Sequence, residues 1–132
     1  MSEATGICSD EASVVAFLQS WAGRDIDHIM SFFAEDAVYH NVPVAPIAGL
    51  AGIRQIFQAF LDAFPEAALD IVNVAGRPGL VFAERIDRFT TTDGRKVILP
   101  VNGVFVLEAG KITRFSDYFD LASFESQSGL EL

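Results

Sequence analysis

The sequence predicts an α+β fold, in which helices come first along the chain and a mainly antiparallel sheet follows. Up to Phe64, apolar residues recur three and four positions apart, which is typical of amphipathic helices. After Pro65, apolar and polar residues alternate with a period of two, and an Asp-Gly pair at residues 93–94 marks a hairpin turn. Helices followed by a meander of strands indicate α+β packing.

The first half of the chain is predicted to contain three helices, a short strand and a loop. Ser9 or Asp10 can accept hydrogen bonds from the free amides that start the first helix, and Asp25 can do so for the second. Pro65 stops the third helix because proline lacks the backbone donor that a helix needs. The predicted helices span residues 9–21, 26–33 and 49–64, the strand residues 37–41 and the loop residues 42–46.

The second half is predicted to form four strands and a short final helix. Gly76–Gly79 and Ala109–Gly110 provide turns between strands. Pro100 lies inside a predicted strand and therefore indicates a bulge or a sheet edge. Asp120 is well placed to cap the final helix. The predicted strands span residues 69–75, 80–91, 97–108 and 112–119, and the helix spans residues 121–127.

Length, composition and charge narrow the range of functions. The chain has 132 residues, which fits a single domain over residues 1–132. It carries 9 basic and 18 acidic residues, so its net charge of −9 makes nucleic acid and anionic membrane surfaces poor partners. Hydrophobic residues make up 51% of the chain. No apolar run reaches the roughly 20 residues of a membrane span, so this excess is expected in a core, an oligomer interface or an apolar pocket.

The start of the chain and its cysteine content bear on the compartment. Met1–Ala12 has neither the basic segment nor the apolar run of a secretory leader. Cys8 is the single cysteine, so no internal disulfide can form, which fits a reducing cytoplasm. His28 and His40 are the two histidines, and neither has a metal-ligand spacing to Cys8, so we expect no metal site.

Three charged residues fall on apolar faces of the predicted strands. Because successive side chains alternate between the two faces of a strand, Arg85 and Asp87 share a face with Val81 and Phe89. Asp117 likewise shares its face with neighbouring phenylalanines. Burying an unpaired charge is costly, so these groups are expected to be paired or functional.

The set of Arg85, Asp87 and Asp117 has two explanations. One guanidinium can bridge two carboxylates, and two carboxylates in an apolar site resist ionising together, so the pair can act as acid and base. Alternatively, the set is a buried ion-pair network that only holds strands together. Tyr39 and Asn41 also share a strand face. They can hold a water or a carbonyl oxygen together, or they are ordinary residues at a strand end.

Three stretches of the chain resemble the limonene-1,2-epoxide hydrolase family in order and spacing. They are Ala37–Pro43 (AVYHNVP), Glu84–Asp87 (ERID) and Asp117–Asp120 (DYFD). The resemblance extends from the first helix to Phe124, and it implies membership of the NTF2-like, or SnoaL-like, superfamily. The implied fold is a cone-shaped α+β structure, in which N-terminal helices pack over the concave face of a strongly curved, mixed, mainly antiparallel sheet.

The resemblance also implies a role for each polar residue. Asp117 matches a general base that takes a proton from a water, and Tyr39 and Asn41 match the residues that hold this water. Asp87 matches the general acid that protonates the epoxide oxygen, and Arg85 matches the residue that bridges both carboxylates. The implied reaction adds water to a small alicyclic or terpene-like epoxide in one step, without covalent intermediate, metal or cofactor. The implied apolar lining of the pocket is Leu18, Trp21, Phe60, Phe64, Leu69, Phe89, Leu99, Val101, Phe119 and Phe124.

Two other functions stay open on this fold, because fold alone does not determine function. A proton-transfer enzyme of the ketosteroid-isomerase or polyketide-cyclase type needs an acid or base that faces an oxyanion site, and Arg85 between the two aspartates argues against it. A non-catalytic module would bind small molecules in a pocket whose polar groups satisfy one another. A homodimer is expected, because an open sheet with long final strands leaves an apolar outer face and the resemblance points the same way.

Overall fold

The computed structural model describes residues 8–132, and residues 1–7, for which the sequence predicts no secretory leader, lie outside the described residues. Within residues 8–132 the chain forms four α-helices, one short 3₁₀ helix and six strands in a sheet of order β2-β1-β6-β5-β4-β3. The elements are α1 (Ser9–Ser20), η2 (Trp21–Gly23), α2 (Ile26–Met30), β1 (Phe33–Asn41), β2 (Ile47–Ala48), α3 (Leu50–Ala63), β3 (Glu66–Arg77), β4 (Leu80–Thr90), β5 (Lys96–Glu108), β6 (Lys111–Tyr118) and α4 (Leu121–Ser128).

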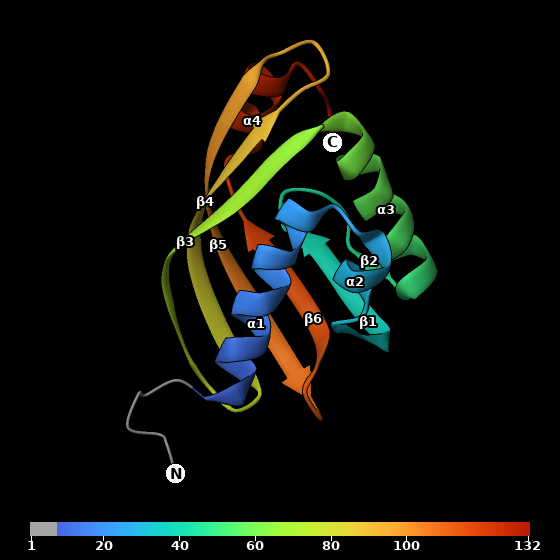
Figure 1. Ribbon diagram of the computed structural model, residues 1–132, viewed down its shortest axis with the longest axis vertical. Helices are drawn as coiled ribbons and strands as arrows, with labels where there is room; N and C mark the ends of the chain where they lie inside the picture. The colour runs from blue at the N-terminus through green and yellow to red at the C-terminus, as the bar shows by residue number, and fades with distance from the viewer. Residues whose placement is uncertain (1–7) are drawn as a thin grey trace.

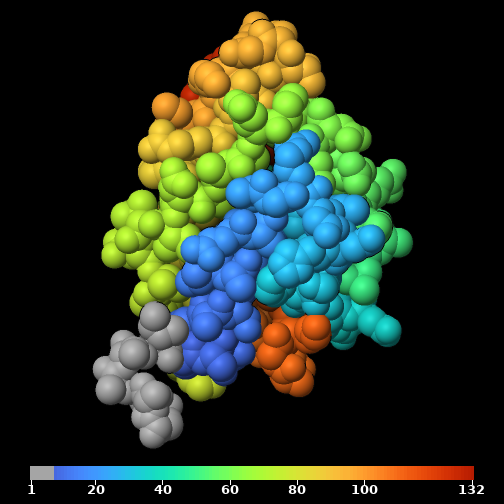
Figure 2. All heavy atoms as spheres, in the orientation of Figure 1, coloured from blue at the N-terminus to red at the C-terminus, as the bar shows by residue number. Residues whose placement is uncertain are grey.

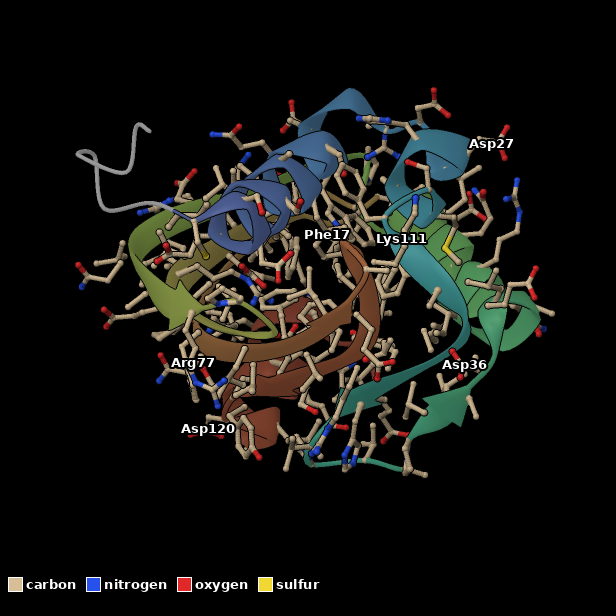
Figure 3. The ribbon with its side chains drawn as sticks, turned by 90° about the horizontal axis from the view of Figure 1, so that it is seen from below. Phe17, Asp27, Asp36, Arg77, Lys111 and Asp120 are labelled. Atoms are coloured by element: carbon tan, nitrogen blue, oxygen red, sulfur yellow. The ribbon has the colours of Figure 1, made fainter. Side chains whose placement is uncertain are left out.

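The sheet is mixed and strongly curved, and helices cover its concave face (Figures 1 and 3). β1 and β6 pair in parallel, whereas the other neighbouring strands are antiparallel. Figure 2 shows α1 and α2 lying side by side across this face, and α4 packs against β5 at the other end of the molecule. The predicted α+β class, with N-terminal helices over a curved and mainly antiparallel sheet, is confirmed.

A cluster of aromatic rings fills the space between α1 and the sheet. Phe17 points from α1 into this space (Figure 3), and its ring meets those of Phe33 and Phe115 edge-on, at centroid distances of 5.2 and 5.4 Å. Phe105 and Phe115 stack on neighbouring strands at 4.5 Å. Each such pair adds about 0.5–1.5 kcal/mol to the stabilisation from burial. A second buried cluster beside α4 consists of Phe64, Val97, Leu99, Val101 and Phe124.

The predicted cap of α1 is wrong. Cys8 caps the helix instead of Ser9 or Asp10: the Glu11 backbone N–H donates to Cys8 Sγ at 3.4 Å, and the Cys8 N–H donates to Glu11 Oε1 at 2.8 Å. Asp10 Oδ2 instead accepts from the Gly79 N–H at 2.8 Å. This contact ties the start of α1 to the turn between β3 and β4, a long-range role that helix-capping rules do not consider.

Strand ends account for most of the remaining differences. β1 begins at Phe33, whereas the sequence predicts a helix there because Phe33 lies at helical spacing from the apolar residues before it. β3 extends on both sides of the predicted residues 69–75, and a register shift between Ile71 and Asn73 interrupts its alternation. β2 has two residues and is not predicted, because so short a strand cannot show alternation.

The end of β5 near α4 is a sheet edge. Pairing of β5 with β6 begins at Asn102, so within residues 8–132 Pro100 has a strand neighbour on one side only, which confirms the predicted edge. Gln127 of α4 occupies the other side. Its Oε1 accepts from the Ile98 backbone N–H at 2.8 Å, and its Nε2 donates to the Ile98 carbonyl at 3.0 Å. The side-chain amide of α4 therefore takes the place of a strand where β6 has ended.

Candidate active site

Arg85 joins two aspartates from different strands in a buried cluster. From β4, Arg85 Nε and Nη2 donate to the two carboxylate oxygens of Asp87 at 2.7 and 3.1 Å. Its Nη1 and Nη2 also donate to the two oxygens of Asp117 on β6, at 2.9 and 2.5 Å. The exposed fractions of Arg85, Asp87 and Asp117 are 2%, 4% and 6%. The side chains predicted from strand alternation to be paired therefore lie in direct contact.

Gly103 makes room for this bridge. It lies on β5 between β4 and β6, opposite Ala83 on one side and Asp117 on the other. A Cβ atom at this position would lie 2.7 Å from Arg85 Nη1 and 3.0 Å from Asp117 Oδ1. The guanidinium group thus crosses β5 where that strand has no side chain. Sequence reasoning missed this residue although the sequence carries a signal for it, because a glycine inside a strand often marks a close approach.

The three charges of the cluster have opposing effects on its pKa values. Burial raises the pKa of Asp87 to about 6, even though Arg85 acts to lower it. Burial acts to lower the pKa of Arg85, but Asp117 and Asp87 outweigh this effect and raise that pKa above its ordinary value. Arg85 is therefore a permanent cation, while Asp87 can exchange a proton near neutral pH. A carboxyl group that still holds a proton near the working pH suits general acid catalysis.

Tyr39 and Asn41 lie beside this cluster because β1 runs parallel to β6. The register pairs Tyr39 with Phe115 and Asn41 with Asp117. The Tyr39 hydroxyl donates to Asn41 Oδ1 at 2.7 Å, which leaves the Asn41 amide N–H groups to bind something else. Burial, with the nearby charge of Asp117, raises the pKa of Tyr39 well above its ordinary value, so the phenol stays a neutral donor.

A cavity of about 70 Å³ opens beside these polar groups. This volume can hold several water molecules. Its wall contains all five predicted polar residues, and every predicted apolar lining residue except Leu18. Leu18 is 1% exposed and packs in the core with Val14 and Phe17. The predicted pocket role of Leu18 is thus corrected, because the cavity wall begins at Trp21, nearly one helical turn further along the chain.

Five further residues line the cavity without having been predicted to do so: Phe57, Leu61, Ala67, Phe115 and Leu132. Phe57 lies in the core, as its helical spacing predicts, and it also contacts the cavity. Phe115 could have been found, since it shares a strand face with Asp117. Leu132 follows the last helix, where periodicity gives no signal.

Neither a group of metal ligands nor a helix fit to span a membrane is found in residues 8–132. No group of three or more His, Cys, Asp or Glu side chains in the described part of the chain is arranged to hold a metal ion. Among the helices of that part, none is both long enough and apolar enough to cross a membrane.

Comparison with known proteins gives the family. Residues 14–115 match the family model of the SnoaL-like domain, which is more than half of the chain. The chain belongs to the SnoaL-like family. Its six-stranded mixed sheet with helices packed on the concave face is consistent with the NTF2-like cone fold.

Solved structures similar to this SnoaL-like chain carry several descriptions. An LEH-like epoxide hydrolase of M. tuberculosis is 25% identical with a TM-score of 0.79, and the match covers 90% of this chain and 88% of that one. A candidate polyketide cyclase of Xanthomonas campestris is 26% identical with a TM-score of 0.81, covering 91% and 96%. An NTF2-like protein of unknown function from Burkholderia pseudomallei is 16% identical with a TM-score of 0.83, covering 94% and 100%, which shows the fold alone. The activity of this chain must therefore be argued from the residues of its site, because these similar structures carry different descriptions.

Proposed function

We propose that this SnoaL-like protein is an epoxide hydrolase that adds water to a small hydrophobic epoxide and gives a vicinal diol. The observation that carries the proposal is the buried Arg85 bridge between Asp87 and Asp117 on the wall of an otherwise apolar cavity. Tyr39 and Asn41 complete a set in which acid, base and water-holding groups lie together. The similarity to the LEH-like epoxide hydrolase supports the same activity.

The proposed reaction is a single displacement with two proton transfers. Asp117 takes a proton from a water that Tyr39 and Asn41 hold, and the water oxygen bonds to one epoxide carbon. The bond between that carbon and the epoxide oxygen breaks, and Asp87 gives its proton to this oxygen. Each turnover moves one proton from Asp87 to Asp117, and exchange with solvent returns it. Arg85 holds both carboxylates in position and keeps their negative charge balanced in both states.

The apolar wall supports an uncharged, largely hydrocarbon substrate. Seven phenylalanines and one tryptophan line the cavity, and Phe64 stacks on Phe89 at a centroid distance of 4.7 Å. Ligand pockets commonly combine an apolar wall with a few polar groups that fix orientation. An alicyclic or terpene-like ring would pack against these apolar side chains and present its epoxide to the polar cluster.

Proton transfer on a polyketide-like substrate is the alternative function. It is favoured by the likeness to the candidate polyketide cyclase of Xanthomonas campestris. The cluster argues against it, because Arg85 lies between Asp87 and Asp117 and bridges the two carboxylates. A base that removes a carbon-bound proton would instead need an oxyanion site facing it.

The test is incubation of cyclohexene oxide, limonene oxide and styrene oxide with the protein in oxygen-18 water. We expect one labelled oxygen in the diol, and a trans-diol from the cyclic epoxides. Asp117→Asn should abolish diol formation while the protein still folds and binds an apolar amide, whereas Asp36→Asn, the same change on the exposed part of β1, should retain activity. Hydrolysis that persists in Asp117→Asn would contradict the role of Asp117 as base, and absence of turnover with all three epoxides would favour a binding module.

We also infer that the protein is a homodimer joined through the outer face of the sheet. Phe82 and Tyr118 are 51% and 49% exposed on this face, opposite to the face that carries Arg85 and Asp117. Exposed apolar groups of this size on one face are typical of an interface. Light scattering should give a dimer mass for the unmodified protein and a monomer mass for Phe82→Arg; a monomer in both would contradict the inference.

A further inference from the structure

The indole N–H of Trp21 is a buried donor without a partner. Trp21 Nε1 is buried and has no hydrogen-bond partner within residues 8–132. A buried tryptophan N–H usually finds an acceptor, and leaving one unpaired costs about 1–3 kcal/mol. Because such groups are rare in folded proteins, each one calls for a physical explanation.

The side chain that carries this donor belongs to a residue of the cavity wall. Trp21 lies on the cavity wall, and its ring packs against Phe57 at a centroid distance of 5.0 Å. Phe57 also packs against Tyr39 at 5.0 Å, so the rings of Trp21 and Tyr39 are at most twice that distance apart. A ligand of one six-membered ring with a short substituent can span such a distance. One small molecule can therefore contact the polar cluster and Trp21 at the same time.

Trp21 differs from the other side chains on the wall. Besides the five polar residues already placed in the reaction, the wall described in residues 8–132 is hydrocarbon, with Trp21 as the exception. A purely hydrocarbon ligand would leave the N–H unpaired in the complex, whereas a ligand with an acceptor at this end would satisfy it. Sites that hydrogen-bond a ligand discriminate strongly against analogues that lack the matching group.

We propose that Trp21 Nε1 donates a hydrogen bond to a second oxygen of the ligand, separate from the epoxide oxygen. The inference rests on the proposed epoxide hydrolase activity for the identity of the reacting group. It narrows the substrate class to oxygenated alicyclic epoxides, in which a carbonyl or ether oxygen lies on a short substituent away from the epoxide. Trp21 is then a specificity-determining residue.

A matched pair of substrates tests the proposal. The first is an epoxycyclohexane with an acetyl substituent, and the second carries an isopropenyl group, in which a methylene replaces the carbonyl oxygen. One hydrogen bond predicts that kcat/KM favours the acetyl compound by about fivefold to tenfold. In Trp21→Phe, which removes the N–H but keeps an aromatic ring, this ratio should fall to about one. Phe60→Leu changes the wall without removing a donor, so the ratio should persist there.

A second measurement tests the donor without requiring turnover. Trp21 is the only tryptophan of the chain, so intrinsic indole fluorescence reports on this site alone. Acetylcyclohexane, which has no epoxide, should shift the emission of the unmodified protein to longer wavelength, and isopropenylcyclohexane should not. This result would support the donor role even if no epoxide were hydrolysed, in which case the proposed activity alone would fail.

Three results would overturn the proposal: equal kcat/KM values for the two epoxides, a ratio that survives in Trp21→Phe, or identical emission with the two non-reactive ligands. Each would mean that the Trp21 N–H is satisfied in another way. The Phe57 ring, inclined at 70° to the indole, is one described alternative. The emission measurement uses the unmodified protein, so it tests the proposal even if Trp21→Phe fails to fold.

Discussion

Replacement of Gly103 by alanine should disturb the candidate active site without altering any of its functional groups. The new Cβ would lie 2.7 Å from Arg85 Nη1 and 3.0 Å from Asp117 Oδ1, where ordinary contact begins at 3.4 Å. The guanidinium must therefore move by about 0.7 Å, although four hydrogen bonds to two buried carboxylates hold it. The position has no positive φ, so the backbone itself accepts alanine.

The size of the effect follows from these contacts. Loss of one hydrogen bond to a charged group costs about 1.5–3 kcal/mol, and replacing glycine returns about 0.4–1 kcal/mol through the unfolded chain. We therefore expect Gly103→Ala to lower the free energy of unfolding by about 1–2 kcal/mol. A misplacement of about 1 Å can cost a factor of about 100 in rate. Diol formation should accordingly fall by about 10- to 100-fold.

Gly23→Ala is the matched control. Gly23 ends η2 and has no positive φ, and no atom lies within 4 Å of the place that a Cβ would take there, so the same substitution meets open space. Urea unfolding and steady-state epoxide hydrolysis should show this variant to be at least as stable and as active as the unmodified protein. If Gly103→Ala behaved like Gly23→Ala in both assays, the idea that the bridge depends on a missing side chain would be refuted.

Three further predictions concern Asp87 and Tyr39. Burial raises the pKa of Asp87 to about 6, so the folded protein holds this proton more tightly than the unfolded chain does. The free energy of unfolding should therefore fall as pH rises from about 4 to about 6. Urea titrations should show this decline for the unmodified protein but not for Asp87→Asn. For the same reason kcat/KM should fall about tenfold per pH unit well above pH 6, and a flat profile from pH 5 to 8 would contradict the role of Asp87 as acid. Tyr39→Phe removes the donor to Asn41 Oδ1. We expect the free energy of unfolding to drop by about 1–2 kcal/mol, and kcat to fall about tenfold or more with little change in KM. A change confined to KM would assign Tyr39 to substrate binding instead.

Strand alternation predicted the long antiparallel part of the fold most closely. β4 and β5 each lie within one residue of their predicted ends, because both alternate regularly and an Asp-Gly turn joins them. The same alternation placed Arg85 and Asp87 on the apolar face of one strand and Asp117 on the apolar face of another, and their contact follows from the sheet order. Local patterns of this kind succeed where one face of a strand is buried throughout its length.

Long-range geometry explains what the sequence could not predict. The parallel pairing of β1 with β6 joins residues that are far apart in the chain, and no local pattern specifies it. That pairing sets Asn41 beside Asp117, so the family resemblance, rather than periodicity, grouped these two residues. Leu18 was misplaced for a related reason: helical spacing identifies its buried face, but not whether that face meets a cavity or a packed core.

The amide of Gln127 on Ile98 also bears on how the molecule avoids aggregation. Lys96–Val101 is a stretch of high β-propensity at a sheet edge, and such edges can recruit strands from other molecules. An incoming strand would find both backbone groups of Ile98 already bound by Gln127 and no N–H at Pro100. The last helix therefore protects this sheet edge from pairing with strands of other molecules. Its removal would expose the backbone groups of Ile98 and favour intermolecular sheet formation.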